Sequence, residues 1–142
     1  MTQDAVTDQT ILYAVEPDLG AGEFIDVLSR SGLGERRPLA DRPRIEAMLR
    51  NADLIVTARA GGRLVGVARS VTDFAFCCYL SDLAVDQAFQ GHGIGKMLMR
   101  RTRSEAGEGV HCLLVAAPKA VGFYEQAGLP RHDDAFLFTE MP

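Results

Sequence analysis

The sequence predicts an α/β fold in a single domain spanning residues 1–142. Two observations support this class. Short β-rich runs and segments with the apolar spacing of helices alternate along the chain, in the order β-αα-βββ-α-β-α-β. The chain has 142 residues, of which 47% are hydrophobic and 24% charged. That size and composition are typical of one globular domain with its own core.

The N-terminal part predicts a strand followed by two helices. The strand covers Ile11–Val15, and Asp18 is expected to cap a helix that ends near Gly32. The polar loop Gly32–Asp41 separates this helix from a second one. Asp41 and the proline two residues later are typical of the start of that second helix.

A hairpin and a third strand follow. Leu54–Ala60 and Arg63–Val71 are rich in β-formers and are joined by Gly61-Gly62, a strong signal for a two-residue turn. A third strand is predicted over Phe76–Val85. Because these three strands are consecutive, we expect them to form an antiparallel meander.

The C-terminal part predicts two further helices and two further strands. A helix extends from Lys96 to about Ala106. The run Val110–Ala116 is continuously apolar and is expected to be a central strand. The spacing Ala120, Phe123, Tyr124 and Ala127 predicts a helix ended by Gly128, and Ala135–Thr139 is expected to close the sheet.

Composition disfavours several classes of function. The net charge of −4 disfavours general nucleic-acid binding, which needs a basic surface. The three cysteines Cys77, Cys78 and Cys112 have neither disulfide-framework nor zinc spacing, so no metal site is expected. The N-terminus lacks the features of a secretory signal, and no apolar run approaches the ~20 residues of a membrane span. We therefore expect a cytoplasmic protein without a membrane partner.

The most informative segment is Gln90–Gly95, which reads Gln-Gly-His-Gly-Ile-Gly between a predicted strand and a predicted helix. Bare backbone at a helix N-terminus suits phosphate binding, because free amides and the helix dipole both attract anions. A glycine-rich turn without a ligand is the alternative. A Walker loop is disfavoured because Met97 follows Lys96, and the glycine spacing does not fit a dinucleotide fingerprint.

Two motifs in the correct order give a resemblance that covers nearly the whole chain. Gln90–Gly95 follows Leu83-Ala84-Val85, and Ala120–Leu129 has the form Ala-x-x-Phe-Tyr-x-x-x-Gly-Leu. Both resemble the GNAT (GCN5-related) N-acetyltransferase superfamily. The resemblance implies a central, mixed but mostly antiparallel sheet of six to seven strands flanked by about four helices.

The resemblance also implies acetyl-coenzyme A as co-substrate. The backbone of Leu83–Val85 would hold the pantetheine arm and polarise the thioester, and the amides of Gly91–Lys96 would cradle the pyrophosphate. The implied cofactor-binding residues are Leu83, Ala84, Val85, Gln90, Gly91, His92, Gly93, Ile94, Gly95, Lys96 and Phe123.

The sequence departs from the family pattern at two positions. Ala117 stands where many members have an asparagine that contacts the pantetheine arm. This removes one expected polar contact with the coenzyme. Leu129 replaces a phenylalanine, which is a conservative exchange of apolar residues.

Acetyl transfer to an amine requires a neutral nucleophile and a proton for the departing thiolate. Making a lysine-like amine neutral at pH 7 costs ~4.6 kcal/mol, so a base or a water path is expected. By resemblance Tyr124 is the candidate general acid, with a core aromatic as the alternative. Asp82 is the candidate base, with a solvated or capping aspartate as the alternative. Tyr79 and Ser81, expected on the opposite strand face, are candidates to orient a water instead.

The resemblance predicts an N-acetyltransferase that acts by direct attack in a ternary complex. The acceptor is expected to be a primary amine of a small molecule or amino-acid-like metabolite, bound near the Gly32–Asp41 loop. A protein N-terminus or lysine is the enzymatic alternative, and a non-catalytic coenzyme A-binding module is the other. A homodimer is possible because many relatives dimerise. Lys96, Arg100 and Arg101 are either phosphate contacts or a solvated helix face.

Overall fold

The computed structural model describes residues 10–142, which contain one five-stranded sheet and four α-helices. The strands lie in the order β1-β2-β3-β4-β5. All neighbouring pairs are antiparallel except β4 and β5, which are parallel. The elements are β1 (Ile11–Val15), α2 (Ala21–Ser31), α3 (Arg42–Arg50), β2 (Leu54–Ala60), β3 (Arg63–Thr72), β4 (Cys77–Val85), α4 (Ile94–Ala106), β5 (His111–Leu113) and α5 (Val121–Gln126).

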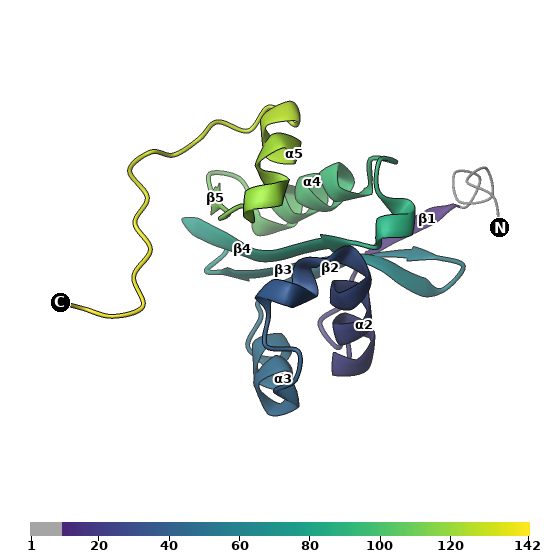
Figure 1. Cartoon of the computed structure of the whole chain (residues 1–142). Helices are drawn as coiled ribbons and strands as arrows, with labels where there is room; N and C mark the ends of the chain where they lie inside the picture. Colours follow the sequence, from purple (N-terminus) through teal and green to yellow (C-terminus); the bar gives the residue numbers. More distant parts are fainter. Residues whose placement is uncertain (1–9) are drawn as a thin grey trace.

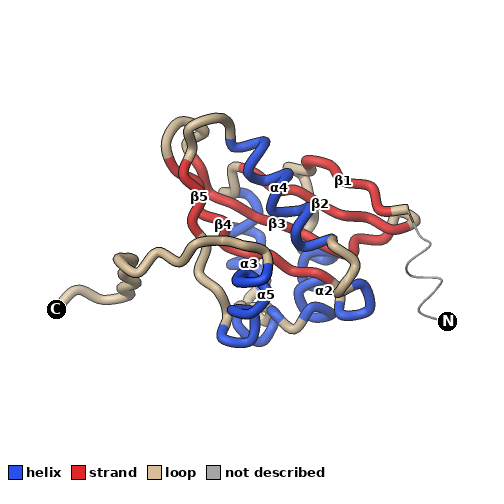
Figure 2. Tube along the Cα trace, turned by 90° about the horizontal axis from the view of Figure 1, so that it is seen from above, coloured by secondary structure: helices blue, strands red, loops and turns tan. Residues whose placement is uncertain are grey.

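The helices cover the two faces of the sheet (Figure 1). α2 and α3 pack on one face through a cluster that includes Phe24, Leu28 and Ile45. α4 lies across the other face, where Ile94 and Leu98 bury their side chains against β2, β3 and β4. Seen from above, α4 crosses the strands obliquely (Figure 2). The two apolar layers hold β4, and the loop that follows it, in a fixed position.

β4 carries an irregularity at Ser81. In the pairing with β3, Ser70 lies opposite Leu80 and Arg69 opposite Asp82, so Ser81 is an extra residue. Such a bulge bends the strand and changes which side chains share a face. Ser81 and Asp82 consequently both face Arg69. The expected alternation of these two residues across the strand is therefore wrong.

β4 and β5 pair over only part of β4. The parallel ladder joins Cys77, Cys78 and Tyr79 to His111–Leu113 and then stops. Within residues 10–142, no further pairing continues along this side of β4 as far as Val85. The resulting open edge lies immediately before the glycine-rich loop.

The C-terminal segment differs from the prediction. Ala135–Thr139 is not a strand, and Phe136 is 90% exposed. In both views this segment extends away from the body of the molecule (Figures 1 and 2). β5, expected over Val110–Ala116 as a central strand, is a three-residue strand at the sheet edge with its residues exposed. The described sheet therefore has five strands, fewer than the predicted six to seven.

Helix caps are partly as predicted. Asp41 caps α3, where its carboxylate accepts from the Arg44 amide at 3.2 Å. Gly32 ends α2 in the left-handed region, with a φ of 91°. Asp18 does not cap α2, because the N-cap is Gly20 and no side chain bonds to the first turn.

Candidate functional site

The glycine-rich loop presents unused backbone amides at the start of α4. Gly91 and Gly93 have φ values of 84° and 81°, a left-handed conformation that glycine adopts without strain. The first helical bond runs from the Met97 amide to the Gly93 carbonyl, at 3.1 Å. The amides before Met97 are therefore not engaged by the helix and form its N-terminal donors. An anion placed here would also be favoured by the helix dipole.

The open edge of β4 presents a second set of backbone groups. The Asp86 amide donates to the Val65 carbonyl on β3 at 2.8 Å. Because successive backbone groups alternate along a strand, the amides of Leu83 and Val85 face away from β3, toward the open edge. The Val85 carbonyl accepts from Gln90 Nε2 at 2.9 Å on that side. The Ala84 amide faces β3, so its predicted contact with a coenzyme does not fit this orientation.

The end of β4, the start of α4 and α5 meet at Gly95. A Cβ atom added at Gly95 would stand 3.0 Å from Phe123 Cζ and 3.7 Å from Val85 Cγ2. The ring of Phe123 therefore covers the first turn of α4, and a larger residue at position 95 would press against it. Three of the predicted binding residues, far apart in the sequence, are adjacent in the fold.

Tyr124 is half-buried on α5 beside Phe123. Their ring centroids are 5.1 Å apart in an edge-to-face arrangement. Burial raises the pKa of the Tyr124 hydroxyl above its usual value of 10.0. The hydroxyl is therefore protonated at neutral pH, as a proton donor must be.

His92 is a further member of the loop with an unusual environment. Its Nε2 atom is buried and has no hydrogen-bond partner among the described residues. A buried polar atom without a partner is costly, and a ligand group could satisfy it. His92 thus adds a side-chain group to the backbone donors of the loop.

Asp82 lies in an environment that does not suit a general base. Its side chain is 0% exposed, and its two oxygens accept from Arg37 Nε and Arg69 Nε. Because the side chain has no exposed surface, an acceptor amine or a water from solvent cannot reach either oxygen. The general-base prediction for Asp82 therefore does not match the geometry, which is that of a buried ion-pair network.

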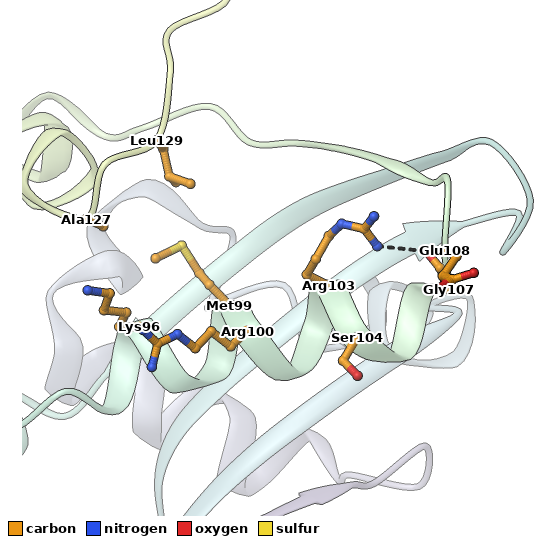
Figure 3. Close-up of a pocket in the computed structure, with 9 residues that line it drawn as sticks. All are labelled: Lys96, Met99, Arg100, Arg103, Ser104, Gly107, Glu108, Ala127 and Leu129. Carbon is orange, nitrogen blue, oxygen red and sulfur yellow. Dashed lines mark hydrogen bonds between the residues drawn. The ribbon is translucent and has the colours of Figure 1, made fainter.

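A cavity of about 630 Å³ lies beside the outer face of α4 (Figure 3). Lys96, Met99 and Arg100 extend into it from α4, and Leu129 borders it from the segment after α5. Arg103 donates to the Gly107 carbonyl at 2.7 Å at the far end. Arg101 does not line the cavity, because it lies within 3.4 Å of the Tyr13 carbonyl on β1. Lys96 and Arg100 thus form a basic wall near the glycine loop.

Sequence reasoning missed Arg37, Arg69 and Arg103. Arg37 lies in the predicted acceptor loop, but nothing local indicates that it contacts Asp82, which is 45 positions away.

Within the described residues there is no group of three or more potential metal ligands. No helix in that same range is long and apolar enough to cross a membrane.

Comparison with known proteins shows the family to which a chain with this site belongs. Residues 23–129, more than half of the chain, match the Acetyltransferase (GNAT) family. The chain belongs to the GNAT family. The matched range includes Gln90–Gly95 and ends at Leu129, so it contains both segments on which the sequence resemblance rests.

Curated GNAT relatives differ in the acceptor for which they are named. Serotonin N-acetyltransferase 2, chloroplastic, of Oryza sativa subsp. japonica is 29% identical over 123 residues, which cover 82% of this chain and 60% of that protein. Histone acetyltransferase TAP1 of Glycine max is 28% identical over an alignment that covers 85% of this chain and 62% of that protein. The chain spans about three fifths of the length of these relatives.

Solved GNAT structures share the fold. A Deinococcus radiodurans R1 protein assigned as an acetyltransferase superposes with a TM-score of 0.73 at 26% identity, covering 98% of this chain and 94% of that one. The aminoglycoside N-acetyltransferase AAC(6')-Iy, in complex with CoA, has a TM-score of 0.69 at 15% identity, covering 93% and 95%. The second likeness is one of fold alone.

Proposed function

We propose that this chain is an acetyl-coenzyme A-dependent N-acetyltransferase that modifies a primary amine of a small molecule or amino-acid-like metabolite. The observation that supports the proposal is the meeting of three segments at Gly95. The open edge of β4, the amides at the start of α4 and the Phe123-Tyr124 pair all border this point. Membership of the GNAT family makes acetyl transfer the chemistry that this arrangement suits.

The residues present fit the coenzyme. Its pyrophosphate would be held by the free amides of Gly91–Lys96. Lys96 and Arg100 would bind the remaining phosphate oxygens from the cavity beside α4. The Leu83 and Val85 amides would bind the pantetheine arm and donate to the thioester carbonyl, where negative charge develops. Acetyl-coenzyme A, once bound, supplies the activated acetyl group.

Two proton transfers remain for the chain to assist. Tyr124 would donate its hydroxyl proton to the departing thiolate. The proton of the acceptor amine would leave through water at the open edge, because Asp82 is closed off by two arginines. Tyr79, which is 40% exposed and lies at the end of the β4–β5 ladder, is placed to orient such a water.

The acceptor class is tested by thiol release from acetyl-coenzyme A. The panel should contain arylalkylamines, free amino acids, polyamines and peptides with either a free N-terminus or an internal lysine. We expect acceptor-dependent turnover on a small primary amine, the class named for the rice relative. Turnover on peptides alone would favour the protein-acetyltransferase alternative, for which the soybean relative is named. Tight coenzyme binding without turnover on any acceptor would contradict the enzymatic proposal.

Gly93→Ala is expected to weaken coenzyme A binding by about tenfold. At a φ of 81° an alanine Cβ is strained by about 1 kcal/mol, and relief of that strain would turn the neighbouring amides away from the orientation proposed to bind the pyrophosphate. Calorimetric titration with coenzyme A measures the affinity, and urea unfolding measures the strain.

Gly62→Ala in the β2–β3 hairpin is the matched control. Its φ is 84°, and like Gly93 it has no neighbouring atom within 4 Å of an added Cβ. It should lower stability by a similar amount and leave coenzyme affinity unchanged. Equal affinities for the two variants would contradict the assignment of the loop to the pyrophosphate.

A further inference from the structure

Two buried charged side chains and a third, partly buried one lie together at the bulge of β4. Asp82 is 0% exposed, Arg69 is 8% exposed and Arg37 is 21% exposed. Asp82 accepts from the Nε atoms of both arginines, one on each carboxylate oxygen. The cluster carries a net charge of +1 and lies between the acceptor loop and the strand that faces the coenzyme.

The same arginines also bind the backbone around the bulge. Arg37 Nη2 donates to the Ser81 carbonyl at 2.8 Å, and its Nη1 donates to the Arg36 carbonyl at 2.9 Å. Arg69 Nη2 donates to Ser81 Oγ at 3.0 Å, and its Nη1 donates to the Met48 carbonyl on α3 at 3.3 Å. Four segments are thereby connected: the loop after α2, the end of α3, and strands β3 and β4.

Stability alone does not account for this cluster. Desolvating three charges costs several kcal/mol per ion, and apolar side chains of similar volume often stabilise a core as well or better. The cluster fixes the positions of the oxygen atoms that it binds, because planar guanidinium groups bind oxygens at fixed angles. Four of the six hydrogen bonds that these arginines donate go to oxygens of Ser81 and Asp82, the two residues immediately before the Leu83 amide.

We propose that Arg37 is a positioning residue that fixes the bulge and, through it, the backbone donors of Leu83 and Val85. The proposal rests on the proposed acetyltransferase function. Ser81 is the extra residue of the bulge, and a bulge without side-chain contacts can shift along its strand. Arg37 binds the Ser81 carbonyl and the Asp82 carboxylate simultaneously. It therefore holds the residues on both sides of the Ser81–Asp82 peptide bond.

A second consequence concerns the acceptor loop. Arg37 belongs to the segment between α2 and α3, and it is bound to β4 rather than to its own helices. The position of this loop and the alignment of the β4 amides therefore depend on the same contacts. Loss of Arg37 should affect coenzyme binding and turnover together, although its side chain touches neither reactant in this proposal.

The test compares Arg37→Met with Arg37→Lys and with Arg36→Met as control. Methionine keeps the length of the side chain and removes the charge and the donors. Asp82 keeps Arg69 as a partner in this variant, so the chain should still fold. Arg36 is the exposed neighbour in the same loop, and its replacement makes the same change in net charge. The three readouts are amide hydrogen exchange of residues 80–85, coenzyme A affinity by calorimetry, and kcat and KM with the best acceptor.

For Arg37→Met we expect at least tenfold faster exchange of those amides in residues 80–85 that face β3, such as that of Ala84, about threefold to tenfold weaker coenzyme A binding and about tenfold lower kcat. Arg37→Lys should recover part of each, because one ammonium can still reach one of the two oxygens. Arg36→Met should match the wild type in hydrogen exchange and in coenzyme A affinity. Unchanged exchange and unchanged coenzyme affinity in Arg37→Met would overturn the proposal, as would a raised acceptor KM with coenzyme affinity unaltered. An inactive wild type would contradict only the enzymatic proposal, because exchange and coenzyme binding still test Arg37.

Discussion

Tyr124→Phe is expected to lower kcat by a factor of about 10² to 10⁴ while leaving coenzyme A affinity within about twofold of the wild type. The substitution removes only the hydroxyl, which in the proposed mechanism protonates the departing thiolate. The aromatic ring stays, so the edge-to-face contact with Phe123 is kept. Burial raises the pKa of Tyr124 above 10.0, so the hydroxyl keeps its proton up to about pH 10. The wild-type rate should therefore fall through loss of this acid only above that pH.

Steady-state rates with saturating acetyl-coenzyme A, measured from pH 6 to pH 10.5, check this expectation. Tyr13→Phe on β1 is the matched control, since burial also raises the pKa of Tyr13 but β2 and β3 separate its strand from β4. Its kinetics should equal those of the wild type. If Tyr124→Phe retains the wild-type rate and pH profile, Tyr124 is not the acid.

Asp82→Asn is expected to reduce the free energy of unfolding by about 3 to 5 kcal/mol, a large share of the stability of a domain of this size. The asparagine fits the same space but leaves Arg37 and Arg69 facing one another without an anion between them. Removing one partner from a buried ion pair is costly because the remaining charge has no solvent to compensate it. Here two charges remain.

Urea unfolding at pH 7, followed by circular dichroism, measures the loss. Asp26→Asn on the exposed side of α2 is the matched control and should change stability by less than about 0.5 kcal/mol. An Asp82→Asn variant as stable as the control would contradict the ion-pair assignment. If Asp82→Asn folded normally and lost only its pH-dependent activity, the role of general base would have to be reconsidered.

Most of the local structure could be predicted from the sequence. The hairpin around Gly61-Gly62, the cap at Asp41 and the end of α2 at Gly32 all follow from residues within a few positions of one another. The glycine-rich loop could be located for the same reason. Its conformation depends on glycines that adopt positive φ, and its amides depend on the start of the helix that follows.

The strand predictions failed where a partner was needed. Ala135–Thr139 has the composition of a strand, but β-propensity reports a fit to a pleated surface and does not supply a neighbouring edge. β5 is likewise shorter and more exposed than its apolar sequence indicates, because it pairs with three residues of β4 and has no strand on its other side among the described residues.

The sequence by itself determined the order of the elements as far as α5, the GNAT resemblance and the two segments expected to bind the coenzyme. Only the tertiary structure decided which groups act together there. It placed Ser81 in a bulge, turned the Leu83 and Val85 amides to the open edge, and closed Asp82 between two arginines. The physical reason is that backbone periodicity is local, whereas register and charge pairing join residues tens of positions apart.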